Sequence, residues 1–115
     1  MLTSRHATDA YARSASHRSL REQEADVFRR TNAVLRRARE KGGIAQVRAL
    51  ADTQQLWGMV INLLLDPDNA LPKALRASIV SVGMTVQREV QSADPNFDFL
   101  LAVNQNMADG LSGAA

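Results

Sequence analysis

The sequence predicts an all-α protein: a single-domain antiparallel helical bundle of about four helices. The chain has 115 residues, which is enough for one hydrophobic core but not for two. Aromatic residues make up only 4% of the sequence, so the core must be mostly aliphatic, a composition that suits helices better than strands. Apolar residues also recur at helical spacing in four segments, which are separated by Gly, Pro, Asp and Asn.

The first predicted helix lies between Ser19 and the glycines at 42–43. Ser19 and Glu22 have the spacing of a capping box, in which each side chain accepts a hydrogen bond from a free amide of the first turn. Gly42 or Gly43 supplies the left-handed residue that ends the helix. The residues before Ser19 are polar and rich in Arg and Ser. We therefore expect residues 1–18 to form a poorly ordered tail and residues 19–112 to form the helical domain.

The second predicted helix runs from just after the glycines to Leu65. Its first half is amphipathic, but from Leu56 onward it is apolar almost all round, with only Gly58 and Asn62 as interruptions. A helix of this kind is buried on several sides or covered by a partner. The apolar run has about half of the roughly 20 residues that a membrane span needs, so no membrane-spanning helix is expected.

Two further helices follow a turn with the sequence DPDNALP. Pro67 ends the second helix, and Pro72 fits the first turn of the third. Gly83, in the third helix, allows a close approach of another element. Asp94 before Pro95 has the pattern of an N-cap followed by a first-turn proline, which predicts the start of the fourth helix.

No motif for chemistry is present, so the sequence predicts no enzyme, no cofactor and no metal site. There is no Cys, and His6 and His17 match no recognised spacing of metal ligands. The N-terminus has no continuous apolar segment typical of a secretory signal.

Positive charge is concentrated in the first part of the chain. Residues 1–48 hold eleven Lys and Arg against five Asp and Glu, whereas residues 49–115 hold three against seven. A basic helix is typical of nucleic-acid binding, and the candidate contacts are Arg29, Arg30, Arg36 and Arg37. Acidic residues are interleaved with these arginines, however, and Asp26 is expected to pair with Arg30. A solvated surface with ion pairs is therefore the favoured interpretation, and contact with nucleic acid stays open as an alternative.

The segment from Trp57 to Gly83 resembles the FlaF family of flagellar biosynthesis regulators of alphaproteobacteria. The matching features are Trp57, the motif PDNALP at 67–72, LRA at 75–77, and Ile79 with Ser81 and Gly83. Looser similarity extends from about Ala10 to Leu111. The resemblance implies a cytoplasmic, non-enzymatic protein that is needed for flagellin production and filament assembly. It also implies flagellin as a partner, with the regulator FlbT as a second one.

A flagellin-binding chaperone or adaptor is the leading hypothesis from the sequence. The resemblance implies that flagellin's terminal segments form amphipathic helices in the filament and need shielding before export. A groove between helices binds such a segment through anchors at i, i+3, i+4 and i+7. The candidate contacts are Trp57, Met59, Val80, Met84 and Met107. Each of them is also explained as an ordinary core or surface residue.

Two other hypotheses remain open at this point. In one, the protein regulates translation of flagellin mRNA through the arginines of the first helix. In the other, it is an adaptor whose main partner is FlbT, with flagellin bound only indirectly.

Overall fold

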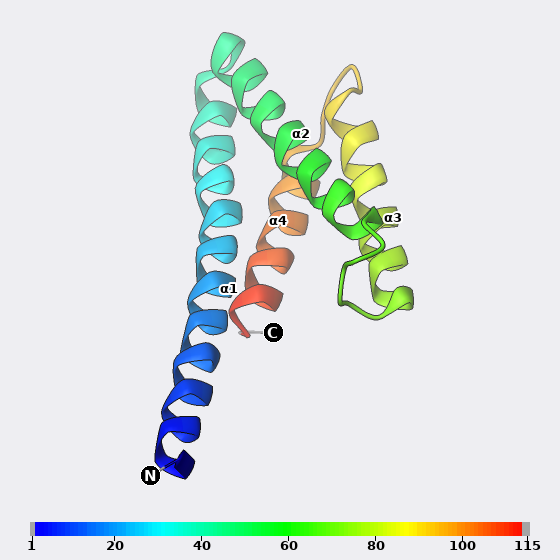
Figure 1. Ribbon diagram of the computed structural model, residues 1–115. Coiled ribbons are helices and arrows are strands. Elements are labelled where there is room, and N and C mark those ends of the chain that lie inside the picture. The colour runs from blue at the N-terminus through cyan, green and yellow to red at the C-terminus, as the bar shows by residue number, and fades with distance from the viewer. Residues whose placement is uncertain (1, 114–115) are drawn as a thin grey trace.

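The computed structural model describes the backbone of residues 2–113 and the side chains of residues 21–113. Four helices make up this part of the chain, and no strand occurs in it (Figure 1). The predicted all-α bundle is thus confirmed. The bounds of the helices are α1 Leu2–Lys41, α2 Gly43–Leu65, α3 Lys73–Val90 and α4 Phe97–Ser112.

Successive helices run in opposite directions, and α2 leaves the end of α1 at a sharp corner (Figure 1). α1 packs against α4 and α2, whereas α3 packs mainly against α2. The corner requires glycine because Gly42 and Gly43 have φ angles of 69° and 56°, in the left-handed region that other residues rarely adopt. The predicted end of the first helix is therefore confirmed.

α1 begins earlier than the sequence predicts. Its helical backbone starts at Leu2 and continues through Ser19, so the chain does not enter the helix at the expected capping box. The physical reason is that residues 1–41 contain neither Gly nor Pro, and nothing local interrupts the helix. The division into a tail at 1–18 and a domain at 19–112 depends on side chains outside the described residues and stays a prediction.

The turn between α2 and α3 is closed by its own side chains, as expected for an Asp- and Asn-rich segment. Asp66 Oδ1 accepts a hydrogen bond from the amide of Asp68, and Asn69 Oδ1 accepts one from the amide of Leu71, both at 2.9 Å. The Asn69 amide group also donates to the carbonyl of Leu63, one of the free carbonyls at the end of α2. The turn is therefore fastened to the helix that it ends.

The start of α4 differs by two residues from the prediction. Asn96, not Asp94, is the N-cap: its side-chain oxygen accepts a hydrogen bond from the amide of Phe99 at 3.0 Å. The amide of Asn96 is itself held by the carboxylate of Glu89 at 2.9 Å. Asn and Asp are almost equivalent as N-caps, so the choice between them depends on this contact with α3, which local sequence does not reveal.

A chain of buried polar groups links three of the helices. Trp57 of α2 donates from Nε1 to the side-chain oxygen of Asn104 in α4 at 2.8 Å. Asn104 donates to Asn32 of α1 at 3.0 Å, and Asn32 donates to the carbonyl of Leu101 at 2.9 Å. Trp57 and Asn104 are fully enclosed, and Asn32 is 1% exposed. Buried polar groups are stable only when paired, so this chain fixes how α1, α2 and α4 align.

The apolar repeat of the sequence predicts one buried face for this helix, formed by Leu20, Val27, Thr31, Val34 and Ala38 and widened by Phe28 and Leu35. The buried face of α1 is displaced from it. The enclosed residues are Ala25, Phe28, Asn32, Leu35 and Ala38. They follow the helical repeat closely, whereas Val27 lies at the edge of this face and is 39% exposed. The sequence pattern missed the centre of the face because Asn32 is polar.

Gly83 lets α3 lie close against α2. A Cβ at this position would lie 2.9 Å from Cγ1 of Ile61 and 3.1 Å from Cε3 of Trp57. Ordinary side chains therefore do not fit, and the expected role of Gly83 in close packing is confirmed.

We expect Asn104→Ala to destabilise the protein by about 2–4 kcal/mol, because it leaves the indole N–H of Trp57 and the oxygen of Asn32 buried without partners. Asn106→Ala is the matched control, since Asn106 is exposed on the same helix and should change stability by less than about 0.5 kcal/mol. Urea denaturation followed by circular dichroism measures both. Equal midpoints for the two variants would contradict the assigned network.

We expect Gly83→Ala to lower the melting temperature, since overpacking costs about 1–3 kcal/mol and exceeds the gain of about 1 kcal/mol in helix propensity. Gly110→Ala should leave the melting temperature unchanged or raise it, because a Cβ there meets nothing within 4 Å. Thermal unfolding of the two variants tests the contrast. A Gly83 variant as stable as the Gly110 variant would show that α3 is not held this closely.

Candidate functional site: an apolar pocket between the helices

An apolar pocket with a volume of about 390 Å³ lies where α1, α2 and α4 meet. Of the described residues that line it, two are polar, Glu24 and Asn69. The others come from every helix and from the turn before α3: Val27, Phe28, Leu56, Met59, Val60, Leu63, Leu64, Leu71, Ile79, Met107 and Leu111. We call this set, with its two polar members, the apolar pocket.

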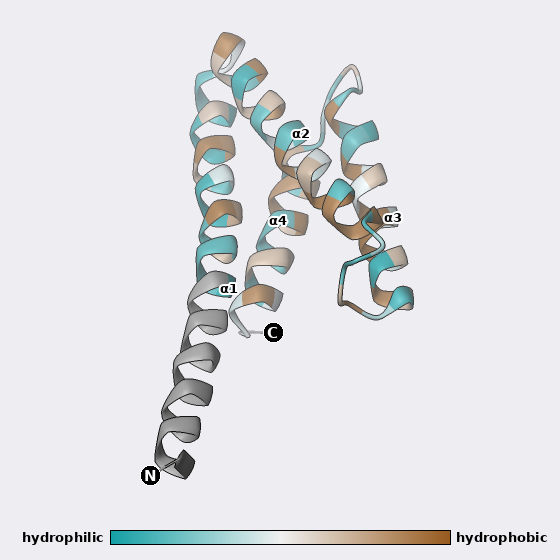
Figure 2. Cartoon of the chain, viewed as in Figure 1, coloured by the Kyte–Doolittle hydropathy of each residue, from teal (hydrophilic) through white to brown (hydrophobic). Residues whose placement is uncertain are grey.

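The apolar pocket is open to solvent, although its walls are hydrophobic. Four of its apolar residues are largely exposed: Leu63 at 63%, Met59 at 58%, Leu71 at 42% and Val27 at 39%. Two of them lie in the last part of α2, where the ribbon is most hydrophobic (Figure 2). Exposed apolar side chains that gather around a cavity mark an interaction site, whereas scattered ones do not.

The floor of the apolar pocket packs against Trp57, which belongs to the buried hydrogen-bonded network with Asn104 and Asn32. Phe28 and Leu64 line the pocket but are almost enclosed, at 4% and 7% exposure. The ring of Phe28 packs edge-on against Trp57, with 5.8 Å between ring centroids and 67° between the ring planes. Because the hydrogen bond to Asn104 fixes the indole, it also fixes the ring that forms the floor.

One end of the pocket is shaped by the turn after α2. Asn69 and Leu71, both in this turn, belong to the lining. Arg76, from the first turns of α3, donates from Nη1 to the carbonyls of Leu64 and Asp66 at 3.4 Å each. These contacts satisfy carbonyls that the end of α2 leaves free, and they hold the turn against α3.

The structure brings together two of the five residues predicted to bind a partner. Met59 and Met107 both line the apolar pocket. Val80 is half-buried and Met84 is 54% exposed, and neither belongs to the lining. Trp57 is fully enclosed in the unbound chain, where its indole packs edge-on against Phe28. Partner binding by all five stays a prediction.

Most of the pocket was missed by reasoning from residue type alone. Leu56, Val60 and Leu63 follow one another at steps of four and three residues along α2 and form one wall. The signal for them was the continuous apolar run of α2, which indicated that a second face was covered or free. It did not indicate which flank stays open, since that depends on how α1 and α4 pack against the helix.

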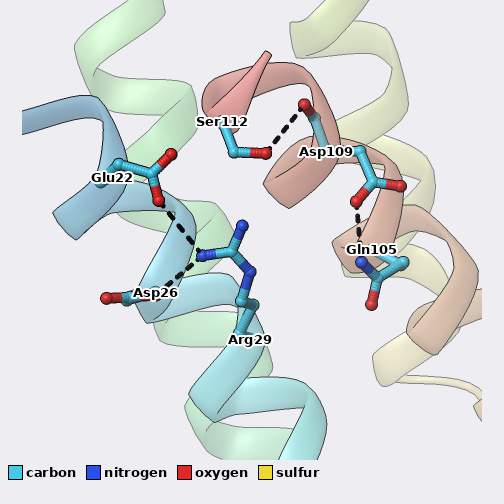
Figure 3. A network of polar contacts seen from close by, with 6 residues as sticks. All are labelled: Glu22, Asp26, Arg29, Gln105, Asp109 and Ser112. Carbon is cyan, nitrogen blue, oxygen red and sulfur yellow. Dashed lines mark hydrogen bonds and ion pairs between the residues drawn. The ribbon is translucent and has the colours of Figure 1, made fainter. Parts of the chain in front are cut away.

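The candidate arginines of α1 differ in whether they pair with carboxylates. Arg29 contacts Asp26 at 2.8 Å and Glu22 at 3.6 Å (Figure 3). The hydrogen bond with Asp26, together with the charge of Glu22, raises the pKa of the Arg29 guanidinium. The predicted pairing of Asp26 with Arg30 is therefore wrong, because the Asp26 carboxylate pairs with Arg29 at position i+3 and not with Arg30 at position i+4.

The remaining candidate arginines lie on the surface of α1. Arg30, Arg36 and Arg37 are exposed. Nearby, Arg39 pairs with Asp98 of α4 at 2.6 Å, which ties the two helices together. On the same helix as Asp98, Gln105 donates to the carboxylate of Asp109 at 2.9 Å (Figure 3). Of the four candidate arginines, Arg29 is thus paired with carboxylates, whereas Arg30, Arg36 and Arg37 form no ion pair with the described side chains.

Two other classes of site find no support in the described part of the chain. Residues 21–113 hold no group of three or more His, Asp or Glu side chains that is arranged to bind a metal ion. His6 and His17 lie outside the described side chains. Within the same limits, no helix combines the length and the apolar character that crossing a membrane requires.

We expect the folded protein to bind a hydrophobic fluorescent dye such as ANS in the apolar pocket, and Leu63→Ser to reduce the fluorescence. Leu65→Ser is the matched control, because Leu65 is equally exposed at 63% but does not line the pocket. Both variants should keep their stability to within about 0.5 kcal/mol. Equal loss of dye binding in both variants, or none in either, would contradict the pocket as the dominant apolar surface.

A family model described as flagellar protein FlaF matches residues 7–111, nearly the whole chain. The match extends from Ala7 in α1 to Leu111 in α4 and includes every described residue of the apolar pocket. Neither the curated proteins nor the solved structures contain a match. The four-helix chain with its open apolar pocket therefore belongs to the FlaF family of flagellar proteins.

Proposed function

We propose that this FlaF-family protein is a flagellin-binding chaperone or adaptor that couples flagellin synthesis to secretion and filament assembly. The proposal is supported by the apolar pocket, which the four helices leave open to solvent beside the core. Covering Met59 and Leu63 with a partner removes from water apolar area that the domain itself does not bury. Family membership supports a flagellar partner.

The form of the pocket favours a helix as the bound segment. The wall formed by Leu56, Val60 and Leu63 rises over about 10 Å, or two helical turns. A ridge with this spacing packs against the grooves of another helix. Met59 and Met107 add flexible thioethers, which adapt to anchors of different shape.

The RNA-binding alternative receives less support from the structure. It requires a row of cations that neutralises successive phosphates, yet Arg29 is already paired with two carboxylates. In the part of α1 whose side chains are described, residues 21–41, the one aromatic residue is Phe28, which is buried and cannot stack on a base.

We expect purified flagellin to bind the protein, and Leu63→Ser to weaken binding by about 1–2 kcal/mol, or roughly five- to thirtyfold in Kd. Leu65→Ser, with the same exposure outside the pocket, should bind like the parent protein. Isothermal titration calorimetry measures all three, and flagellin without its terminal segments serves as the negative control.

The same measurements separate the alternatives. Absence of flagellin binding at near-physiological salt would remove the chaperone proposal. Binding of flagellin only after FlbT is added would favour the FlbT adaptor. Binding of the flagellin mRNA leader that falls steeply with salt, and that is lost on replacing Arg30, Arg36 and Arg37, would favour the RNA regulator.

A further inference from the structure

One charged residue stands on the inward side of α1 and lines the apolar pocket. Glu24 precedes Phe28 by one helical turn, and the two side chains face the same cavity together with Val27. The other two carboxylates in this part of α1, Glu22 and Asp26, are turned toward Arg29 instead. Among the described residues that line the pocket, Glu24 therefore supplies the only formal charge.

A carboxylate in this place constrains what can cover the pocket. While the pocket is empty, Glu24 is exposed and hydrated. A helix that seats its apolar face against Val27, Met59 and Leu63 displaces water from the same region. A carboxylate that loses water without gaining a counter-charge costs free energy, whereas one that meets a cation recovers it. Electrostatic matching of this kind sets specificity more than affinity.

We propose that the apolar pocket selects amphipathic helices that carry a Lys or Arg beside their apolar stripe, and that Glu24 recognises this cation by forming an ion pair with it. The charge complementarity defines one occupant: a helix of another polypeptide, with anchors at i, i+3 or i+4, and i+7, flanked by a basic side chain. The inference rests on the proposed function for the identity of the natural partner. It adds the charge that this partner must carry and the residue that recognises it.

The test uses labelled helical peptides of about 18 residues, a length at which isolated helices become stable enough to study. All peptides carry the same leucine stripe, and one position that flanks the stripe is Lys, Gln or Glu. Fluorescence anisotropy gives the Kd of each peptide for the parent protein and for Glu24→Lys. Glu40→Lys is the matched control, because Glu40 is an exposed glutamate of α1 outside the pocket and its replacement changes the net charge equally.

For the parent protein we expect the order Lys, Gln, Glu from tightest to weakest, with about a fivefold or greater difference between the extremes. Glu24→Lys should reverse the order, whereas Glu40→Lys should preserve it. Leu63→Ser should weaken all three peptides, which would locate them in the pocket. Thermal unfolding of each variant confirms that the fold is retained, and higher salt should compress the differences between the peptides.

Three outcomes would overturn the inference. Equal affinities for the three peptides, or the same order in Glu24→Lys, would show that Glu24 does not read the charge. Failure of every peptide to bind would show that the pocket does not accept a helix. A dimer in sedimentation that Leu63→Ser dissociates would assign the pocket to a second copy of the chain. Failure of flagellin alone to bind, with the peptide order intact, would remove only the proposed partner.

Discussion

The structure depends on the hydrogen-bonded chain that runs from Trp57 through Asn104 to Asn32. Its polar atoms are buried where water cannot replace a lost partner, so α1, α2 and α4 have one mutual register in which all of them are satisfied. Aliphatic side chains alone tolerate several packings of comparable energy, because dispersion and burial are not directional. The paired asparagines remove that freedom. α3 stands outside this chain and is held against α2 by the close contact at Gly83.

The same register explains why α2 is apolar almost all round in its second half. One side of it carries Trp57 and Leu64 into the core, and Gly83 of α3 closes over Ile61 on another. The remaining flank, with Leu56, Val60 and Leu63, faces the space that α1 and α4 leave beside the core. Because the hydrogen bonds fix the neighbouring helices, this space cannot simply collapse. An open apolar pocket is thus a direct consequence of how the interior is fastened.

Much of the fold follows from local sequence. The glycines at 42–43 and the segment DPDNALP end α1 and α2 where predicted, because left-handed backbone and side-chain-closed turns are local effects. The buried polar residues of the core could not be predicted from local sequence. An asparagine within an apolar stripe looks like a break in the stripe until its hydrogen-bond partner on another helix is known. The candidate site was predictable in part. Residue type pointed to Met59 and Met107, but the contribution of Glu24 and the open flank of α2 depend on long-range packing.

Methyl NMR of protein labelled at the methionine methyl groups tests the central claim that the apolar pocket is where a partner docks. Met59 and Met84 provide an internal comparison, because they are similarly exposed, at 58% and 54%, and only Met59 lines the pocket. If flagellin docks in the apolar pocket, we expect its titration to shift or broaden the resonances of Met59 and Met107 and to leave that of Met84 in place. A shift of Met84 with Met59 and Met107 unchanged would contradict it and would place the partner on α3 instead.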